Sequence, residues 1–327
     1  DVQINNNFIQ DCTPNADSDA IHVQSQNYDN VDRADHHCHC VVADNFIKSS
    51  VPMKRGIKTQ YLNAKIMNNT VIGDNITIGY DTYADGTIHS GNSFTSQGNS
   101  GEAFGVHDVD RAQIVNCNIV MEDAVGIAIR LAGSTNCEYG GVPVGDTLGI
   151  IKLEGTSTVL ASNVNLKLGV RGGNGFFLEG ASRLYLSNSV IHNARVGVRN
   201  NYSSGFCKIN NCDFFQTVYG FEGFGSNGFT LDITDSYITC DTIGIFGTSG
   251  GNSSQISATN VRILSSNHGI LGGDTDIIKG CTITTDSTTA GSQGIGFGTA
   301  AVIRDNMVQG FATALVSTYD TDQVIVN

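Results

Sequence analysis

Apolar and polar positions alternate in short runs along the chain, and one arrangement of these runs recurs. Residues 184–200, LYLSNSVIHNARVGVRN, show it whole: an alternating run, an Asn, a few apolar residues, a polar gap, then Gly and an apolar residue that open a new run. Alternation with a period of two is typical of β-strands, because successive side chains of a strand point to opposite faces. The pattern therefore predicts short strands joined by tight bends.

The arrangement returns at a nearly constant spacing. In the second half of the chain, the Gly that opens the last strand of each copy recurs in steps of 22 to 25 residues, at Gly175, Gly197, Gly220, Gly244, Gly269 and Gly294. Earlier copies place this marker at Gly105, Gly126 and Gly149, and looser copies place it at Ala20, Gly56 and Gly86. A unit this short has no room for a helix and must stack on its neighbours to bury an apolar face.

We therefore expect an all-β fold, a right-handed parallel β-helix of about thirteen coils. It should form a single domain over residues 1–327, with irregular coils and insertions over 1–104 and regular coils over 105–327. The first and last residues lie inside predicted strands, whereas a solenoid needs polar caps at its ends. We expect the sequence to be part of a longer chain.

The bend inside each copy carries asparagine. An Asn side chain can bond the backbone of the coils above and below, and Asn tolerates a left-handed backbone. Three cysteines, Cys117, Cys212 and Cys281, follow the bend and should point into the core. The bend asparagines are Asn6, Asn45, Asn116, Asn163, Asn188, Asn211, Asn260 and Asn306.

Coils that read N-x-I and then G-I-x-V resemble the right-handed parallel β-helix of the pectin-lyase-like superfamily, over nearly the whole chain. This superfamily includes pectate lyases, polygalacturonases, alginate epimerases and phage tailspike depolymerases. The sequence holds none of the catalytic signatures of the plant cell-wall enzymes and no DPHE motif, and its N-terminal insertions and Asn-rich, acidic composition resemble the tailspikes most. That resemblance implies a homotrimer that binds and hydrolyses a bacterial surface polysaccharide, in a virion tail or outside the cell.

Charge and composition exclude several other classes. The net charge is −13 and the sequence has no basic block, which argues against nucleic acid, because phosphate binding needs clustered Lys and Arg. No apolar run approaches the roughly 20 residues of a membrane span, so we expect no membrane insertion. Glycine clusters such as GFGSNG are not followed by a predicted helix, and we expect no cofactor. The nine cysteines include no CxxC pair, so most should be free and buried.

The segment DRADHHCHCVV, residues 32–42, resembles a metal site in its density of His and Cys. Aligning HCVVADNFI with DVQINNNFI places Cys40 and Val42 on the inward face, where Val2 and Ile4 lie. Cys38 then points inward as well, and His37 and His39 point outward. Ligands on opposite faces of one strand cannot converge on zinc, so we expect buried cysteines beneath surface histidines. A divalent-ion site or a substrate edge made by Asp35, His37 and His39 stays open.

Any ligand of a packed solenoid must bind its outside, so outward positions that stack on one another are the candidate sites. The first outward position after each marker reads His22, Lys58, His89, His107, Ala128, Lys152, Phe177, Arg199, Glu222 and Phe246. The next outward position reads Gln24, Gln60, Gly91, Val109, Arg130, Glu154, Glu179, Asn201, Phe224 and Thr248.

Two groups stand out in these columns. One is a basic column of His22, Lys58, His89 and His107, and the other gathers around the glutamates Glu154, Glu179 and Glu222. Glu154 and Glu179 would lie about 5 Å apart on adjacent coils, a spacing compatible with a retaining glycosidase, and pairing either with Glu222 would approach the inverting range of about 6.5 to 9.5 Å. These three glutamates are the catalytic candidates, and the substrate-binding candidates are Arg130, Arg199, Phe177, Phe224, Phe246, His107, Lys58 and His89.

Other interpretations of the same residues stay open. Exposed charges are often merely solvated. The His and Lys column could support β-elimination by a polysaccharide lyase or epimerase, with Lys54, Arg55, Lys58, His89 and His107 as its groups. The chain could also be a non-catalytic adhesin or receptor-binding spike that uses the same face. A calcium site at Asp74, Asp81 and Asp85 is a weaker possibility.

Overall fold

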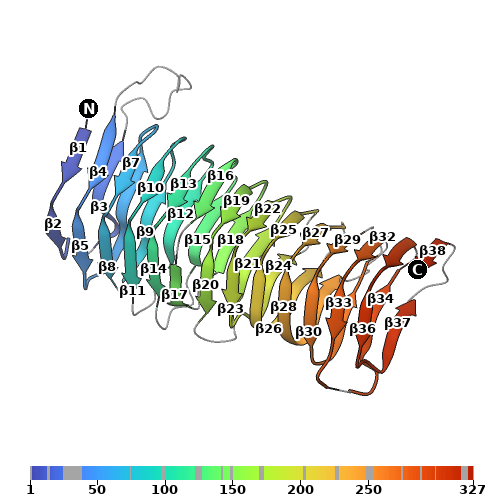
Figure 1. Ribbon diagram of the computed structural model, residues 1–327. Coiled ribbons are helices and arrows are strands. Elements are labelled where there is room, and N and C mark those ends of the chain that lie inside the picture. Colours follow the sequence, from blue (N-terminus) through green and yellow to red (C-terminus); the bar gives the residue numbers. More distant parts are fainter. Residues whose placement is uncertain are drawn as a thin grey trace. The chain divides into compact units, whose positions relative to one another are not determined.

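The computed structural model is built of parallel β-strands stacked coil upon coil, and it confirms the predicted β-solenoid (Figure 1). The described residues contain strands, bends and turns but no helix. They are residues 2–12, 15–24, 39–73, 75–96, 101–121, 127–140, 143–147, 150–168, 173–201, 204–224, 228–247, 254–273, 275–287, 289–298, 300–317 and 323–326.

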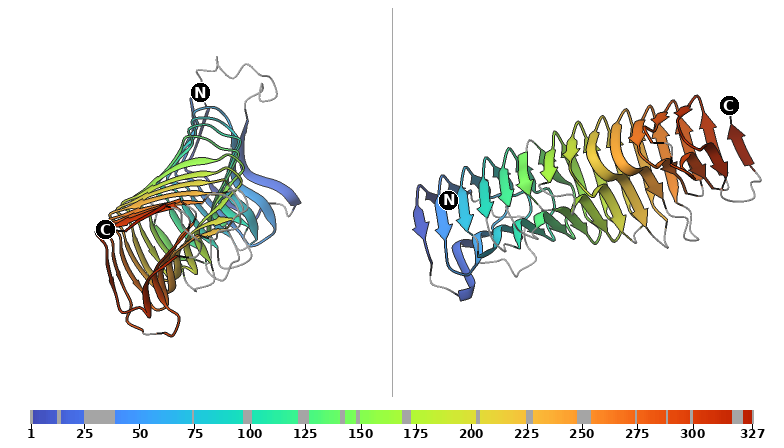
Figure 2. Two further views of the ribbon diagram at one scale, coloured as in Figure 1. Left: turned by 90° about the vertical axis from the view of Figure 1, so that its right-hand side faces the viewer. Right: turned by 90° about the horizontal axis from the view of Figure 1, so that it is seen from below.

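The chain divides into two compact units, each described here by itself. Unit 1 comprises residues 1–160 and 164–170, and unit 2 comprises residues 161–163 and 171–327. Strand β19 (Thr158–Ser162) is divided between them. In both units each coil contributes strands to three columns, and neighbouring strands within a column pair in parallel (Figure 2).

Unit 1 has one strand of every coil in each column. The first column contains β1 (Val2–Asn5), β4 (Cys40–Ala43), β7 (Lys65–Met67), β10 (Ile88–Ser90), β13 (Gln113–Val115) and β16 (Cys137–Gly140). The second contains β2 (Phe8–Gln10), β5 (Phe46–Ser49), β8 (Thr70–Gly73), β11 (Ser93–Ser96), β14 (Asn118–Met121), β17 (Pro143–Thr147) and β20 (Asn165–Leu168). The third contains β3 (Asn15–Gln24), β6 (Met53–Gln60), β9 (Ile76–Thr82), β12 (Glu102–His107), β15 (Ile127–Ala132) and β18 (Ile150–Glu154).

Unit 2 follows the same plan, except that two long strands serve both the second and the third column. Its first column contains β22 (Arg183–Ser187), β25 (Phe206–Asn210), β27 (Thr230–Thr234), β29 (Gln255–Thr259), β32 (Thr275–Lys279), β35 (Ala300–Arg304) and β38 (Gln323–Val326). The second contains β23 (Val190–His192), β30 (Arg262–Ser265), β33 (Thr282–Thr284) and β36 (Met307–Gln309). The third contains β21 (Asn174–Glu179), β24 (Val196–Asn201), β31 (His268–Leu271), β34 (Gln293–Phe297) and β37 (Thr313–Ser317). The long strands are β26 (Asp213–Phe224) and β28 (Tyr237–Gly247).

The core is a stack of apolar side chains that the period-two pattern turns inward. Along β22, Leu184 and Leu186 are buried while Arg183 is exposed. Leu184 pairs with Cys207, and Cys207 with Leu231, so equivalent inward positions lie above one another.

The marker glycines of unit 2 stack in the predicted column. Strand pairing places Gly197 beside Gly220, Gly220 beside Gly244, and Gly244 beside Gly269. The reason is steric: a Cβ on Gly220 would lie 2.6 Å from Ile238 Cγ2, and one on Gly244 would lie 2.5 Å from Ile263 Cγ2. These glycines therefore leave room for large side chains of the following coil.

The bend asparagines occupy two adjacent positions rather than one. At the first position, Asn116 and most of the predicted asparagines adopt a positive φ. At the second, Asn45 is buried, and Asn306 bonds the preceding coil, with Cys281 N–H donating to Asn306 Oδ1 at 2.8 Å and Asn306 Nδ2 donating to Ile278 O at 2.9 Å. Cys117, Cys212 and Cys281 take this second, inward position, as predicted.

Candidate functional site

The His- and Cys-rich segment lies partly outside the described residues. Strand pairing confirms the alignment drawn from the sequence, because Val2 pairs with Cys40 and Ile4 with Val42. Cys40 is buried and His39 is exposed. The remaining residues of interest, Asp35, His36, His37 and Cys38, are not among the described ones. Within the described ranges, no group of three or more His, Cys, Asp or Glu residues is placed to hold a metal ion.

The outward column of unit 1 differs from the predicted one. Pairing along the third column gives the order His22, Lys58, Asp81, Gly105, Arg130 and Lys152. The marker is the small residue at the corner where each coil enters the third column. It is Ala103 in β12 and Ala128 in β15, and not Gly105 or Gly126 as predicted. The predicted marker was two residues too late in β12 and two residues too early in β15. His107 was therefore assigned to the first outward position instead of the second, and Arg130 to the second instead of the first.

His89 does not belong to this column, so its predicted role in binding substrate is wrong. It lies on β10 in the first column and is 1% exposed. Its Nε2 lies 2.8 Å from Thr82 Oγ1, and its ring packs edge-on against Tyr80 and Phe104 at centroid distances of 5.8 and 5.4 Å. Burial lowers the pKa of His89 to about 3. The side chain is part of the core.

The third-column surface of unit 1 carries a network of ion pairs around Asp81. Arg55 donates from Nε to Asp81 Oδ2 and from Nη1 to Asp19 Oδ1, and His107 Nε2 lies 3.3 Å from Asp81 Oδ1. Lys58 lies over the ring of Tyr83 at 5.8 Å, and Tyr83 stacks on His107 at 4.9 Å. The Asp81 side chain is fully buried beneath these groups.

This arrangement does not favour the calcium site suggested by the sequence. The carboxylate of Asp81 is buried and held by Arg55, so it is not open to a calcium ion. Asp74, another of the suggested ligands, lies outside the described residues.

A second ion-pair network joins β12, β15 and β18. Arg130 Nη1 donates to Glu102 Oε1 at 2.9 Å and its Nε donates to Glu154 Oε2 at 2.8 Å, while Lys152 also pairs with Glu154. Burial alone would raise the pKa of Glu154, but the hydrogen bonds from Lys152 and Arg130 outweigh it and keep that pKa below its ordinary value. Glu154 is therefore an ionised ion-pair partner, poorly suited to act as a general acid.

The outward column of unit 2 matches the prediction. Phe177 pairs with Arg199, Arg199 with Glu222, and Glu222 with Phe246. The guanidinium carbon of Arg199 lies 5.9 Å from the ring centroid of Phe177 and 5.2 Å from that of Phe224. Phe224 in turn meets Phe246 edge to face at 6.0 Å. We call these five residues, Phe177, Arg199, Glu222, Phe224 and Phe246, the Arg199 face.

Glu222 is the acid of the Arg199 face, and it is almost fully enclosed. It is 3% exposed, and its Oε2 lies 3.5 Å from Arg199 Nε. Burial raises the pKa of Glu222 above its ordinary value, and Arg199 and Arg195 oppose this only in part. A raised pKa favours the protonated form of the carboxyl group, which is the form that a general acid needs.

The three predicted catalytic glutamates do not form one described cluster. Glu154 belongs to unit 1 and Glu179 to unit 2, so their predicted spacing stays a prediction. Within unit 2, Glu179 pairs with Asn201, and Asn201 with Phe224. Glu179 and Glu222 are thus two coils apart, roughly 10 Å along the stack.

Sequence reasoning missed Glu102, which pairs with Arg130, and named Asp81 only as a calcium ligand, whereas it pairs with Arg55. The missing signal was the small residue at the corner: Gly79 lies in the same column as Gly56 and Ala103. Taking Gly79 instead of Gly86 as the marker would have placed Asp81 at the outward position beside Lys58.

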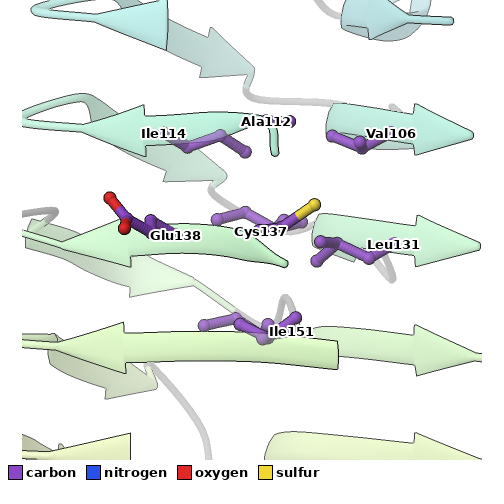
Figure 3. Close-up of a pocket in the computed structure, with 9 residues that line it drawn as sticks. Val106, Ala112, Ile114, Leu131, Cys137, Glu138 and Ile151 are labelled. Atoms are coloured by element: carbon purple, nitrogen blue, oxygen red, sulfur yellow. The ribbon is translucent and has the colours of Figure 1, made fainter. Parts of the chain in front are cut away.

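A cavity in the interior of unit 1 is too small for a ligand. Val106, Ile129, Leu131 and other apolar side chains enclose about 10 Å³, and the carboxylate of Glu138 points away from them (Figure 3). A space of that size barely admits one water molecule, and an apolar one stays dry. The described residues also contain no helix with the length and hydropathy of a membrane span.

Comparison with known proteins gives similarity to solved structures but no match in sequence. No protein-family model matches the sequence, and no curated protein matches it. Among solved structures, the chain is similar to the Streptococcus pneumoniae surface protein and adhesin PfbA, with a TM-score of 0.42 and 10% sequence identity over 88% of this chain and 91% of that chain.

Proposed function

We propose that this β-solenoid binds a polysaccharide through the Arg199 face of unit 2. The observation that carries the proposal is the position of the Arg199 guanidinium between the rings of Phe177 and Phe224. Both rings and the guanidinium are half-buried, so part of each stays open to solvent. The face thereby combines flat apolar surface with fixed hydrogen-bond donors.

These are the groups that recognise sugars. A sugar ring presents an apolar face that packs on an aromatic ring and hydroxyl groups that bond to fixed donors. Strand pairing repeats the outward positions at about 4.8 Å from coil to coil. Such a repeat suits a ligand that extends along several coils, as a polysaccharide does.

The test compares variants of the Arg199 face with a matched aromatic elsewhere in the unit. Arg199→Ala and Phe224→Ala should each weaken binding to a panel of purified bacterial surface polysaccharides at least tenfold, about 1.4 kcal/mol, in biolayer interferometry. Phe206→Ala removes a surface ring that pairs with Tyr185 at 5.5 Å in the first column, and it should leave binding unchanged. Equal losses in all three variants, or no binding by the parent protein, would contradict the proposal.

Hydrolysis of the bound polysaccharide is the second candidate function. The raised pKa of Glu222 favours it, because this carboxyl group could protonate a glycosidic oxygen. Its partner carboxylate is not identified among the described residues. Binding alone, as in an adhesin or receptor-binding spike, therefore explains more of the observed surface than cleavage does.

Glu222→Gln separates cleavage from binding. If the chain is a hydrolase, this variant should stop the release of new reducing ends while retaining polysaccharide binding. Ultraviolet absorbance from an unsaturated product would instead indicate a lyase. If the parent releases no products from any polysaccharide that it binds, the chain is a binding protein.

The tailspike resemblance adds expectations about assembly and location that stay predictions. A homotrimer would have about three times the chain mass of 34.6 kDa in light scattering. The genes that flank this one would show whether the protein belongs to a virion or to another structure outside the cell.

A further inference from the structure

A polar surface pocket opens in unit 2 away from the Arg199 face. It has a volume of about 140 Å³ and lies between β26, β28, β30 and the segment that follows β33. Its polar walls come from Gln216, Thr239, Asp241, Ser265, Ser266 and Asp286.

An irregularity in β26 shapes the pocket. The pairing between β26 and β28 shifts between Phe214 and Thr217, and Gln216 adopts a φ of 54°. The Gln216 N–H donates to Thr239 Oγ1 at 3.2 Å, which holds this conformation. Irregularities of this kind bend a strand and redirect its side chains. Here the bend opens the wall at the corner between the second and third columns.

The serine hydroxyl nearest the pocket is not open to it. Ser265 is 1% exposed, and its Oγ is enclosed on the inward face of β30, like the side chain of Ile263. A ligand in the pocket would therefore contact the other polar side chains of the lining, those of Gln216, Thr239, Asp241, Ser266 and Asp286.

The charges in the pocket limit the class of ligand. Among the described residues, the lining contains two aspartates, Asp241 and Asp286, and no lysine, arginine or histidine. Carboxylates accept hydrogen bonds from hydroxyl or amino groups and repel another carboxylate. Cys240 also lines the pocket, and burial raises its pKa to about 12, so the thiol is neutral and not a nucleophile. The site is suited to binding and not to covalent chemistry.

We propose that this pocket binds one sugar unit that carries no carboxylate, through hydrogen bonds to its hydroxyl or amino groups. The volume is below the range of drug-sized sites, which begins at about 300 Å³, and suits a single small ring. The pocket is separate from the Arg199 face, because Cys240 and Phe246 are six residues apart on β28, about 20 Å along the strand. This inference goes beyond the proposed function and does not rest on it.

The test uses sugars that share a ring and differ in charge. In saturation-transfer NMR at millimolar concentrations, methyl glucoside and glucosamine should bind the protein, and glucuronate should bind at least tenfold more weakly. Asp286→Asn should reduce this preference for glucosamine over glucuronate at least threefold. Asp305→Asn, the same change at an exposed carboxylate elsewhere in unit 2, should leave it unchanged.

Asp241→Asn is the second variant, because it removes the other negative charge of the lining and should reduce the same preference. Glucuronate binding as tight as glucosamine, no binding of any of these sugars, or equal effects of Asp286→Asn and Asp305→Asn would each overturn the inference. Arg199→Ala should not affect monosaccharide binding. A failure of this proposal is therefore distinguishable from a failure of the proposed polysaccharide surface.

Discussion

Single residues of the same type have different roles in this solenoid, depending on the face they occupy. His39 is exposed, His107 is half-buried beside Asp81, and His89 is enclosed in the core. The sequence shows the imidazoles but not these environments, because a histidine can be tolerated inside when one nitrogen finds a partner such as Thr82. Assigning His89 to the surface was wrong for this reason.

The environment of His89 predicts a pH dependence of stability. The unfolded chain binds a proton at this residue below pH 6.5, whereas the folded chain does so only near pH 3. The unfolded state therefore holds more protons in this window, and the free energy of unfolding falls as the pH is lowered, by at most about 1.4 kcal/mol per pH unit from this group.

His89→Gln should flatten this dependence between pH 6.5 and pH 4, as measured by urea unfolding at several pH values. The same substitution at the exposed His39 should leave the slope as in the parent. A parental slope in the His89→Gln variant would contradict the assignment.

At the scale of strands and bends, stacked polar side chains stabilise the coils of unit 1. Asn69 Oδ1 accepts from Asn45 N and Nδ2 at 3.0 and 2.9 Å. Asn69 Nδ2 donates to Val42 O at 2.9 Å and to Asn92 Oδ1 at 3.0 Å. The Asn69 amide thus bonds the coil on either side. The bend of one coil depends on the bends of its neighbours.

Asn69→Ala should lower the free energy of unfolding by about 2–4 kcal/mol, because it leaves the buried Asn45 N–H and Val42 carbonyl without these partners. Asn75→Ala removes an exposed amide that bonds Ser50 O at 3.2 Å, and should cost less than 1 kcal/mol. Guanidinium unfolding measures both changes, and losses of similar size would argue against a stabilising ladder.

The sequence predicted these elements better in unit 2 than in unit 1. In unit 2 the corner residues from Gly175 to Gly294 are glycines, and a steady step between them identifies the outward positions beside Arg199. In unit 1 the corner tolerates alanine at Ala103 and Ala128, so the same rule failed there. The sequence also could not show which charges are held in ion pairs, since the pairing of Glu154 with Arg130 depends on side-chain geometry across coils.

At the scale of the whole molecule, the reactivity of the cysteine thiols can show which coils unfold together. Among the described cysteines, Cys12 is half-buried and the others are buried and free, as expected. Burial raises the pKa of Cys40 to about 11 and that of Cys207 to about 12. Such thiols are neutral at ordinary pH and unreactive until their coil opens.

A Cys12→Ser/Cys38→Ser variant should therefore have no fast-reacting thiol in its native state. Mass spectrometry of alkylated peptides across a urea series then follows each coil separately. The single domain predicted from the sequence requires Cys117 in unit 1 and Cys207 in unit 2 to become reactive at the same urea concentration. Separate midpoints would show two domains that unfold independently.

The column of corner glycines in unit 2 has a consequence for how such a chain can change in length. Each glycine accommodates a bulky side chain from the next rung, so what a position tolerates is decided by a residue about 14 to 19 places further along the polymer. Duplicating or deleting one complete rung preserves every such match, whereas inserting a single amino acid within a strand reverses which side chains face inward. Evolution of this architecture should therefore proceed by whole rungs, with smaller insertions confined to the bends.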